Sequence, residues 1–137
     1  MTGGVVPTLR YRDAHKAIEF LVAAFGFKVH SLFEDDDGHV LHAELTHGDG
    51  MVMLGDNRES EWGGLVTSPR EAGKPTGGSY VIVDDPFAHA EQARQAGAEI
   101  VREPREEDYG GAGYTARDPE GYLWDFGSYD PWAADSG

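Results

Sequence analysis

The sequence contains no cysteine among its 137 residues. This absence excludes disulfide bonds, thiolate nucleophiles and cysteine-based zinc sites. No apolar run approaches the roughly 20 residues that span a membrane, and the N-terminus lacks the basic-then-apolar pattern of a signal peptide. We therefore expect a cytoplasmic protein.

Basic residues are also scarce. The chain has 11 Lys and Arg against 25 Asp and Glu, which gives a formal net charge of −14. Such a chain without a basic cluster repels phosphate backbones and anionic lipids, so we expect neither a nucleic-acid partner nor a membrane partner. A cationic or neutral ligand is compatible with this charge, although solubility alone explains it. The content of 39% hydrophobic and 11% aromatic residues is typical of a globular protein.

The chain contains an internal repeat with the order β-α-β-β-β. Helical spacing of apolar residues predicts helices over 14–25 and 86–96. Apolar patterning and turn signals predict strands over 5–11, 27–33, 39–46, 51–54, 79–83, 98–102, 114–117 and 122–126. Capping and turn residues match at a constant offset of 71: Asp13 with Asp84, Ala17 with Ala88, Gly26 with Gly97, and Gly50 with Gly121.

This repeat predicts one α+β domain over 1–137, in which two βαβββ modules form an open, cup-shaped mixed sheet with the helices on its outer face. The first module covers 4–56 and the second covers 78–129. A polar linker rich in Gly and Pro, 57–77, joins them, and the tail, 130–137, has no periodicity. Neither module can close a core alone, so the uncovered sheet face is the expected pocket.

Strand alternation assigns side chains to that concave face. Thr8 in the first strand, His42 and Glu44 in the third, and Asp125 in the last are expected there. A histidine with two carboxylates could hold a divalent cation, and a carboxylate could act as a general base. The spacing of these residues matches no zinc signature, and solvated positions on an exposed strand explain them equally simply.

The offset of 71 makes a separate prediction for the first strand of the second module. Tyr80 and Ile82 are expected in the core, whereas Ser79 and Val81 are expected on the concave face. A slip of one residue would invert this assignment.

Two aromatic residues lie outside the predicted helices and strands, Trp62 in the linker and Tyr109 in a loop. Loop aromatics can close over a pocket or stack on a flat ligand, although small hydrophobic clusters under loops are equally common. His47 and His89 lie in polar surroundings, and we expect both at the surface.

Several segments resemble those of a known family: 9–27 (LRYRDAHKAIEFLVAAFGF), 42–45 (HAEL), 50–54 (GMVML), 83–85 (VDD), 96–98 (AGA), 117–124 (RDPEGYLW) and 129–132 (YDPW). They are similar to segments of the glyoxalase / bleomycin-resistance / dioxygenase proteins, also called vicinal oxygen chelate proteins. The resemblance covers nearly the whole chain apart from the linker and tail. It implies paired βαβββ modules, usually in a dimer. It implies no single function, because the superfamily contains isomerases, dioxygenases, fosfomycin-modifying enzymes and drug-sequestering proteins.

Enzymes of that superfamily place metal ligands on the first strand of each module and on the last strand of one or both. The resemblance assigns these positions to Val6, Gly77, Leu54 and Asp125. Only Asp125 can ligate, and a catalytic metal usually needs three protein ligands. The resemblance therefore implies a member without metal, cofactor or catalytic residues, like the bleomycin-resistance branch, whose proteins bind a drug without chemistry.

We predict a non-catalytic homodimer that binds an aromatic, cationic or peptide-like antibiotic for sequestration or self-resistance. The expected ligand-binding residues are Thr8, His42, Glu44, Trp62, Tyr109 and Asp125. One alternative is a metal-dependent lyase or dioxygenase in which His42, Glu44 and Asp125 rebuild a metal site. Another is a protein partner that uses the exposed sheet edge. Whether the modules pair within one chain or swap between two chains is left open by the sequence.

Overall fold

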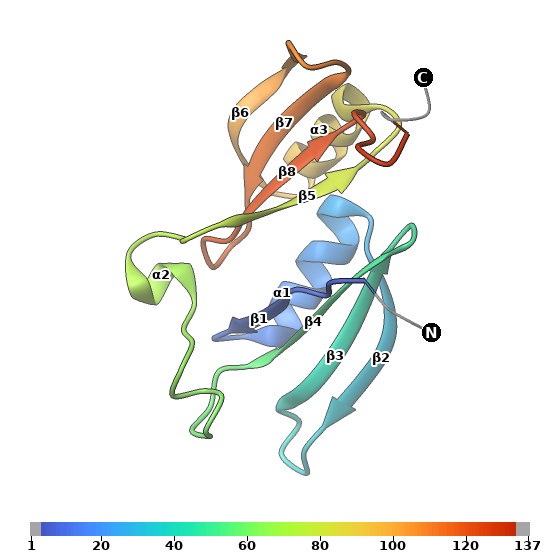
Figure 1. Cartoon of the computed structure of the whole chain (residues 1–137). Coiled ribbons are helices and arrows are strands. Elements are labelled where there is room, and N and C mark those ends of the chain that lie inside the picture. Colours follow the sequence, from blue (N-terminus) through green and yellow to red (C-terminus); the bar gives the residue numbers. More distant parts are fainter. Residues whose placement is uncertain (1–3, 134–137) are drawn as a thin grey trace.

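The computed structural model describes residues 4–133 of the chain. The first half of the chain, here called the first unit (residues 8–56), builds one four-stranded mixed sheet (Figure 1). Its elements are β1 (Thr8–Tyr11), α1 (Ala14–Phe20), the π-helical turn η1 (Leu21–Phe25), β2 (Lys28–Glu34), β3 (Val40–His47) and β4 (Gly50–Asp56). The strand order is β1-β4-β3-β2, with β1 parallel to β4 and the other pairs antiparallel.

The second unit (residues 78–127) repeats this order in a second mixed sheet, β5-β8-β7-β6, in which β5 is parallel to β8. Its elements are β5 (Gly78–Ile82), α3 (Pro86–Gln95), β6 (Glu99–Glu106), β7 (Ala112–Arg117) and β8 (Leu123–Gly127). Helices cover one face of each sheet, and neither sheet closes into a barrel (Figure 1). The predicted α+β class, with two βαβββ modules in an open arrangement, is confirmed, and each module forms a mixed sheet of its own.

The segment between the two units passes along one side of the molecule (Figure 1). It contains a short helix that its composition did not predict, α2 (Pro69–Ala72). The predicted tail is described as far as residue 133, and its last four residues, 134–137, lie outside the described residues. Within residues 4–133, no helix is both long enough and apolar enough to cross a bilayer.

The first helical segment begins and ends where the sequence predicts. The Asp13 carboxylate accepts a hydrogen bond from the Lys16 amide at 3.1 Å, as an N-cap does. Gly26 ends the segment with a left-handed φ of 86°, a conformation that glycine adopts without steric cost.

The offset between the two units is not constant. The second helix begins at Pro86 as predicted, but its capping residue lies one position later than the one that the offset of 71 matched with Asp13. Asp85, rather than Asp84, caps α3 by accepting two backbone amides. Thirteen positions separate Asp13 from Gly26, but only twelve separate Asp85 from Gly97. The π-helical turn η1 takes up the extra residue of the first unit. The first strands of the two units are therefore related by an offset of 72.

This difference of one residue inverts the predicted faces of β5. Tyr80 pairs with Asp125 on the uncovered face, and Val81 pairs with the buried Phe126. Tyr80 and Ile82 retain 41% and 40% of their exposure, so the prediction that they lie in the core is wrong. Because successive side chains of a strand point to opposite faces, a shift of one residue moves each side chain to the other face.

Aromatic side chains join the two units in one core. The Phe25 ring, at the end of the first helical segment, lies 4.7 Å from Phe126 and 5.9 Å from Trp124 of β8. Phe27 lies 5.4 Å from the same tryptophan, and all four rings are buried. Truncation of such a ring to alanine typically costs about 3–5 kcal/mol, so this contact fixes one unit against the other.

Hydrogen bonds from the second unit also satisfy the free edge of β1. The Tyr122 hydroxyl accepts from the Arg10 amide at 3.1 Å and donates to the Arg10 carbonyl at 2.9 Å. Beside it, the Tyr11 hydroxyl donates to the buried carboxylate of Asp118 at 2.7 Å, and the Trp124 indole donates to the same oxygen at 3.1 Å. These bonds hold β1 in place and thereby position the side chains of its uncovered face.

Candidate functional site

Three of the predicted ligand-binding residues meet in one pocket on the uncovered face of the first sheet. Thr8 projects from β1, His42 from β3, and Trp62 comes from the segment after β4. The pocket has a volume of about 310 Å³. Its other lining residues are Leu9, Arg10, Leu41, Met53 and Leu54. We call it the open-face pocket.

Strand register explains why these side chains share a face. Thr8 of β1 pairs with Met53 of β4, which pairs in turn with Glu44 of β3, and paired residues project to the same side of a sheet. Trp62 lies in no strand and is 44% exposed, so its indole forms an accessible aromatic wall.

His42 and Glu44 form a hydrogen-bonded pair on this face. His42 Nε2 lies 2.8 Å from Glu44 Oε2, and His30 Nε2 lies 4.0 Å from the other carboxylate oxygen. The bond from His42 holds the pKa of Glu44 below its usual value, so Glu44 is ionised. Because the carboxylate can only accept, His42 Nε2 donates to it, and a neutral His42 keeps Nδ1 as an acceptor. The pair can therefore accept a hydrogen bond from a ligand.

The open-face pocket also contains Arg10, which was not among the predicted ligand-binding residues. Its guanidinium lies over Gly55, where a Cβ atom would come within 2.6 Å of Arg10 Nη1. Burial and the charge of Arg58 lower the pKa of Arg10. Its position two residues after Thr8 was the available signal, since alternation places both on one face. None of the eight described lining residues is Asp or Glu, so the net charge of −14 does not make this pocket acidic.

Asp125 lies on the uncovered face of the second sheet, where it is already engaged. The Thr115 hydroxyl donates to Asp125 Oδ1 at 2.5 Å. Arg102 donates to the same hydroxyl oxygen at 3.2 Å and to Glu107 at 3.2 Å. The network holds the carboxylate against β7.

Tyr109 belongs to a small aromatic cluster beside the second sheet. Its ring packs edge-on against Tyr129 at 5.2 Å and remains 61% exposed. The Tyr80 hydroxyl donates to the Tyr129 carbonyl at 2.7 Å, and burial raises the pKa of Tyr80, so the hydroxyl stays protonated. Sequence reasoning missed Tyr80 because the slip of one residue assigned it to the core.

The six predicted ligand-binding residues thus fall on two different sheets. The first sheet and its following segment carry Thr8, His42, Glu44 and Trp62, and the second sheet and its loop carry Asp125 and Tyr109. The lining of the open-face pocket includes neither member of the second group.

The residues do not fit a catalytic metal. With the corrected offset of 72, the metal-ligand positions of the resembling enzymes fall on Val6, Gly78, Met53 and Asp125. Gly78 and Met53 replace Gly77 and Leu54 of the prediction, and Asp125 is still the only member with a ligating oxygen. One such ligand is fewer than the three that a catalytic metal usually needs.

The alternative set of metal ligands is not assembled either. His42 and Glu44 are bonded to each other on the first sheet, whereas Asp125 lies on the second. Within residues 4–133, the only group of three acidic or histidine side chains with closely spaced ligand atoms is Asp35, Asp37 and His39. These three are exposed near the β2–β3 turn, away from the open-face pocket.

Two βαβββ units with uncovered sheet faces define the class of protein as one with a glyoxalase-type fold. The profile of the Glyoxalase/Bleomycin resistance protein/Dioxygenase superfamily matches residues 5–126. The chain belongs to this superfamily, which confirms the identification from sequence motifs.

Similar proteins agree with this assignment. The uncharacterized protein Mb0911c of Mycobacterium bovis is 31% identical over 121 residues, which cover 88% of this chain and 80% of the relative. The crystal structure of TioX from Micromonospora sp. ML1 has 30% identity and a TM-score of 0.72, covering 91% of this chain and 94% of TioX. The fosfomycin resistance protein FosX of Mesorhizobium loti shares the fold, with 14% identity, a TM-score of 0.68, and coverage of 100% and 99%.

Proposed function

We propose that the protein is a non-catalytic binding protein that sequesters an aromatic, peptide-like antibiotic, acting in the cytoplasm as a homodimer. The observation that carries this proposal is the open-face pocket, where Thr8, His42 and Trp62 converge. Of the four family metal-ligand positions, only Asp125 has a ligating oxygen, and it lies on the second sheet. Membership in a superfamily whose description includes bleomycin resistance proteins supports it.

The lining of the pocket favours an aromatic guest with polar amide groups over a strongly cationic one. Trp62 offers a flat apolar surface, Arg10 and Thr8 offer donors, and His42 Nδ1 offers an acceptor. Arg10 would repel a cation placed beside it.

The size of the pocket indicates that it holds only part of such a guest. A volume of about 310 Å³ lies at the lower end of drug-binding pockets, which range over roughly 300–1,000 Å³. One planar ring system fits, and the rest of a peptide-like antibiotic would extend along the uncovered faces. In the homodimer that we propose, the second sheet of the other copy supplies Tyr109 and Asp125 to this extension.

Fluorescence titration with a panel of intercalating and glycopeptide drugs tests the proposal. A drug that stacks on Trp62 will quench its emission, and Trp62→Ala will weaken binding by at least about tenfold, because a truncated aromatic anchor commonly loses about 2 kcal/mol. Trp132→Ala is the matched control, because Trp132 is 87% exposed and does not line this pocket. Absence of binding across the panel, or equal effects of the two variants, would overturn the proposal.

Mass spectrometry of the bound drug separates sequestration from chemistry. We expect the drug to be recovered unchanged after incubation, with or without added Zn²⁺, Mn²⁺ or Fe²⁺. Stoichiometric transition metal in the purified protein together with a modified drug would instead support the metal-dependent lyase or dioxygenase alternative.

A further inference from the structure

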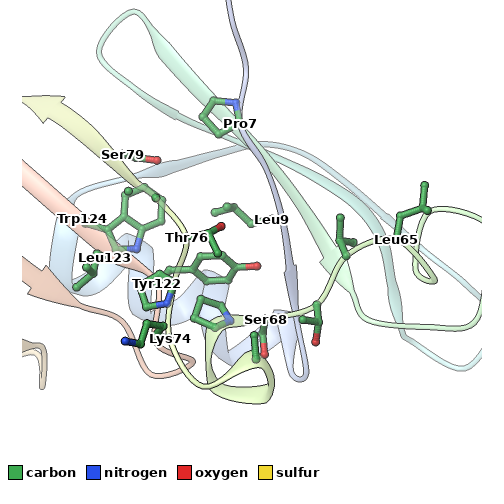
Figure 2. A pocket seen from close by; sticks show the side chains of 17 residues that line it. Pro7, Leu9, Leu65, Ser68, Lys74, Thr76, Ser79, Tyr122, Leu123 and Trp124 are labelled. Atoms are coloured by element: carbon green, nitrogen blue, oxygen red, sulfur yellow. The ribbon is translucent and has the colours of Figure 1, made fainter.

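A larger pocket lies at the junction of the two units, and we call it the junction pocket. Its volume is about 490 Å³. Side chains from β1, the segment 65–77, the start of β5 and the start of β8 surround it (Figure 2). Leu9, Leu65, Tyr122 and Leu123 supply most of its large apolar side chains.

The junction pocket is a separate cavity from the open-face pocket, although Leu9 of β1 lines both. Alternation along β1 directs Thr8 to the uncovered face, whereas Pro7 lines the junction pocket. The turn after β4 contributes to both, because Trp62 lines the open-face pocket, Leu65 lines the junction pocket, and the Leu65 amide donates to the Trp62 carbonyl at 2.9 Å.

The lining of the junction pocket is positively charged, whereas the chain as a whole is negatively charged. Lys74 is its only charged lining residue, and no Asp or Glu is among the described residues that line it. Within residues 4–133, the Lys74 ammonium has no ion pair or hydrogen bond, whereas Arg12, Arg94 and Arg102 are paired with glutamates. In a chain with a net charge of −14, an unpaired cation at the rim of an apolar pocket is available to a ligand.

Hydroxyl groups add further donors around the same space. The side chains of Thr67, Thr76 and Ser79 line the junction pocket, and none of them is hydrogen-bonded to another described residue. An anionic group beside Lys74 would gain a charge-assisted contact and could accept from these hydroxyls.

We propose that the junction pocket is a second ligand site, which takes a compact aromatic or branched apolar molecule carrying one negative charge, such as a carboxylate. The apolar walls receive the body of the ligand, and Lys74 receives its anionic group. A pocket of about 490 Å³ accommodates a molecule of one to two rings. This site is independent of the drug-binding function proposed for the uncovered face.

A pair of fluorescent probes tests the charge preference directly. The probe 8-anilinonaphthalene-1-sulfonate is an aromatic monoanion, and N-phenyl-1-naphthylamine has the same ring system without the charge. We expect the anion to bind with a stoichiometry of one per chain. Lys74→Met will weaken binding of the anion about tenfold and leave the neutral probe unchanged, whereas Lys74→Arg will retain both.

Filling the pocket tests its location. Gly77 lines the pocket and has no positive φ, and no atom lies within 4 Å of where its Cβ would be, so Gly77→Leu is expected to add volume at the pocket wall. It will weaken binding of both probes. Gly4→Leu is the matched control, because Gly4 has the same open surroundings and does not line the pocket.

The open-face pocket provides the remaining comparison. Trp62→Ala will leave binding of the anionic probe intact, even if it abolishes drug binding, so the two proposals can fail separately. Near-UV circular dichroism of each variant checks that it is folded. The inference is overturned if the anionic probe does not bind, if Lys74→Met affects both probes equally, or if Trp62→Ala abolishes binding while Gly77→Leu does not.

Discussion

At the scale of single residues, two histidines share one backbone carbonyl where the units meet. His89 Nε2 donates to the Phe25 carbonyl at 2.8 Å, and His47 Nε2 donates to it at 3.1 Å. His89 Nδ1 lies 2.6 Å from the Tyr114 hydroxyl and accepts from it. Both imidazoles are therefore satisfied in their neutral form, and burial lowers the pKa of each.

This arrangement predicts that stability falls under mildly acidic conditions. An unfolded histidine has a pKa of about 6.5, and the pKa of folded His89 lies below it, so the unfolded state binds protons first as the pH falls. The stabilisation is complete above about pH 6.5 and is lost as the pH falls toward the folded pKa. Urea unfolding at about pH 8 and about pH 5.5 will show a loss on the order of 1 kcal/mol.

His89→Gln isolates the contribution of this residue. The variant will be less stable near neutral pH, but its stability will change less between the two pH values. His30→Gln serves as the control, because His30 is exposed on β2 and has no such buried bonds. A wild-type pH dependence in the His89 variant would contradict the argument. Polar sequence neighbours had predicted both histidines at the surface, and His47 and His89 are instead half-buried by contacts distant in sequence.

At the scale of elements, one residue separates the predicted repeat from the observed one. Asp13 and Gly26 mark the ends of the first helical segment correctly, because capping and left-handed turns are local properties of the chain. The insertion in η1 leaves no mark of its own in the sequence. It changes the assignment of faces in β5, where Tyr80 and Ile82 lie on the uncovered face instead of the predicted core face. Side chains alternate between the two faces of a strand, so a shift of one residue reverses every assignment.

The π-helical turn predicts a deletion that the fold will tolerate. Removal of Ala23, an exposed residue of η1, converts the turn to regular α-helix and keeps Phe25 directed at the core. We expect a loss of about 1 kcal/mol or less in the free energy of unfolding. Removal of Glu91, an exposed residue of α3, is the control, since it rotates the buried Ala93 by about 100° out of the core.

Thermal and urea unfolding of the two deletion variants provide the measurement. The Glu91 deletion will lower stability by several kcal/mol, because the helix after it no longer presents its apolar side to the sheet. Equal destabilisation by both deletions would show that η1 is required in its π-helical form.

At the scale of the whole molecule, the sequence predicts individual strands and loops better than the contacts between segments far apart in the chain. Thr8, His42 and Trp62 line one pocket, and strand alternation and the position of a loop aromatic could be read along the chain. The bond between Tyr122 and Arg10 joins positions 112 residues apart and leaves no periodic signal. Which side chains of different strands and loops share a pocket depends on such contacts, so the sequence did not show that Asp125 and Tyr109 of the second module lie outside the open-face pocket.

The uncovered faces lead to a prediction about assembly. Tyr80 and Ile82 remain substantially exposed on the second sheet, and Phe33 does so on the first. Apolar side chains gathered on uncovered faces are typical of surfaces that bind a partner. The proposed homodimer would cover them, and sedimentation velocity will then show a dimer that Ile82→Lys dissociates. Phe87→Lys is the control, because Phe87 is similarly exposed but lies on α3.

The net charge predicts how the proposed dimer would respond to salt. Each copy carries −14, so two copies repel each other before their apolar faces meet. The screening length falls from about 30 Å at 0.01 M salt to about 8 Å at 0.15 M, which weakens that repulsion much more than it weakens apolar burial. The dimer dissociation constant will therefore decrease as salt is raised over this range. A dimer that weakens with salt would indicate that opposite charges, rather than apolar faces, hold the copies together, and a monomer at every concentration and salt would exclude the assembly.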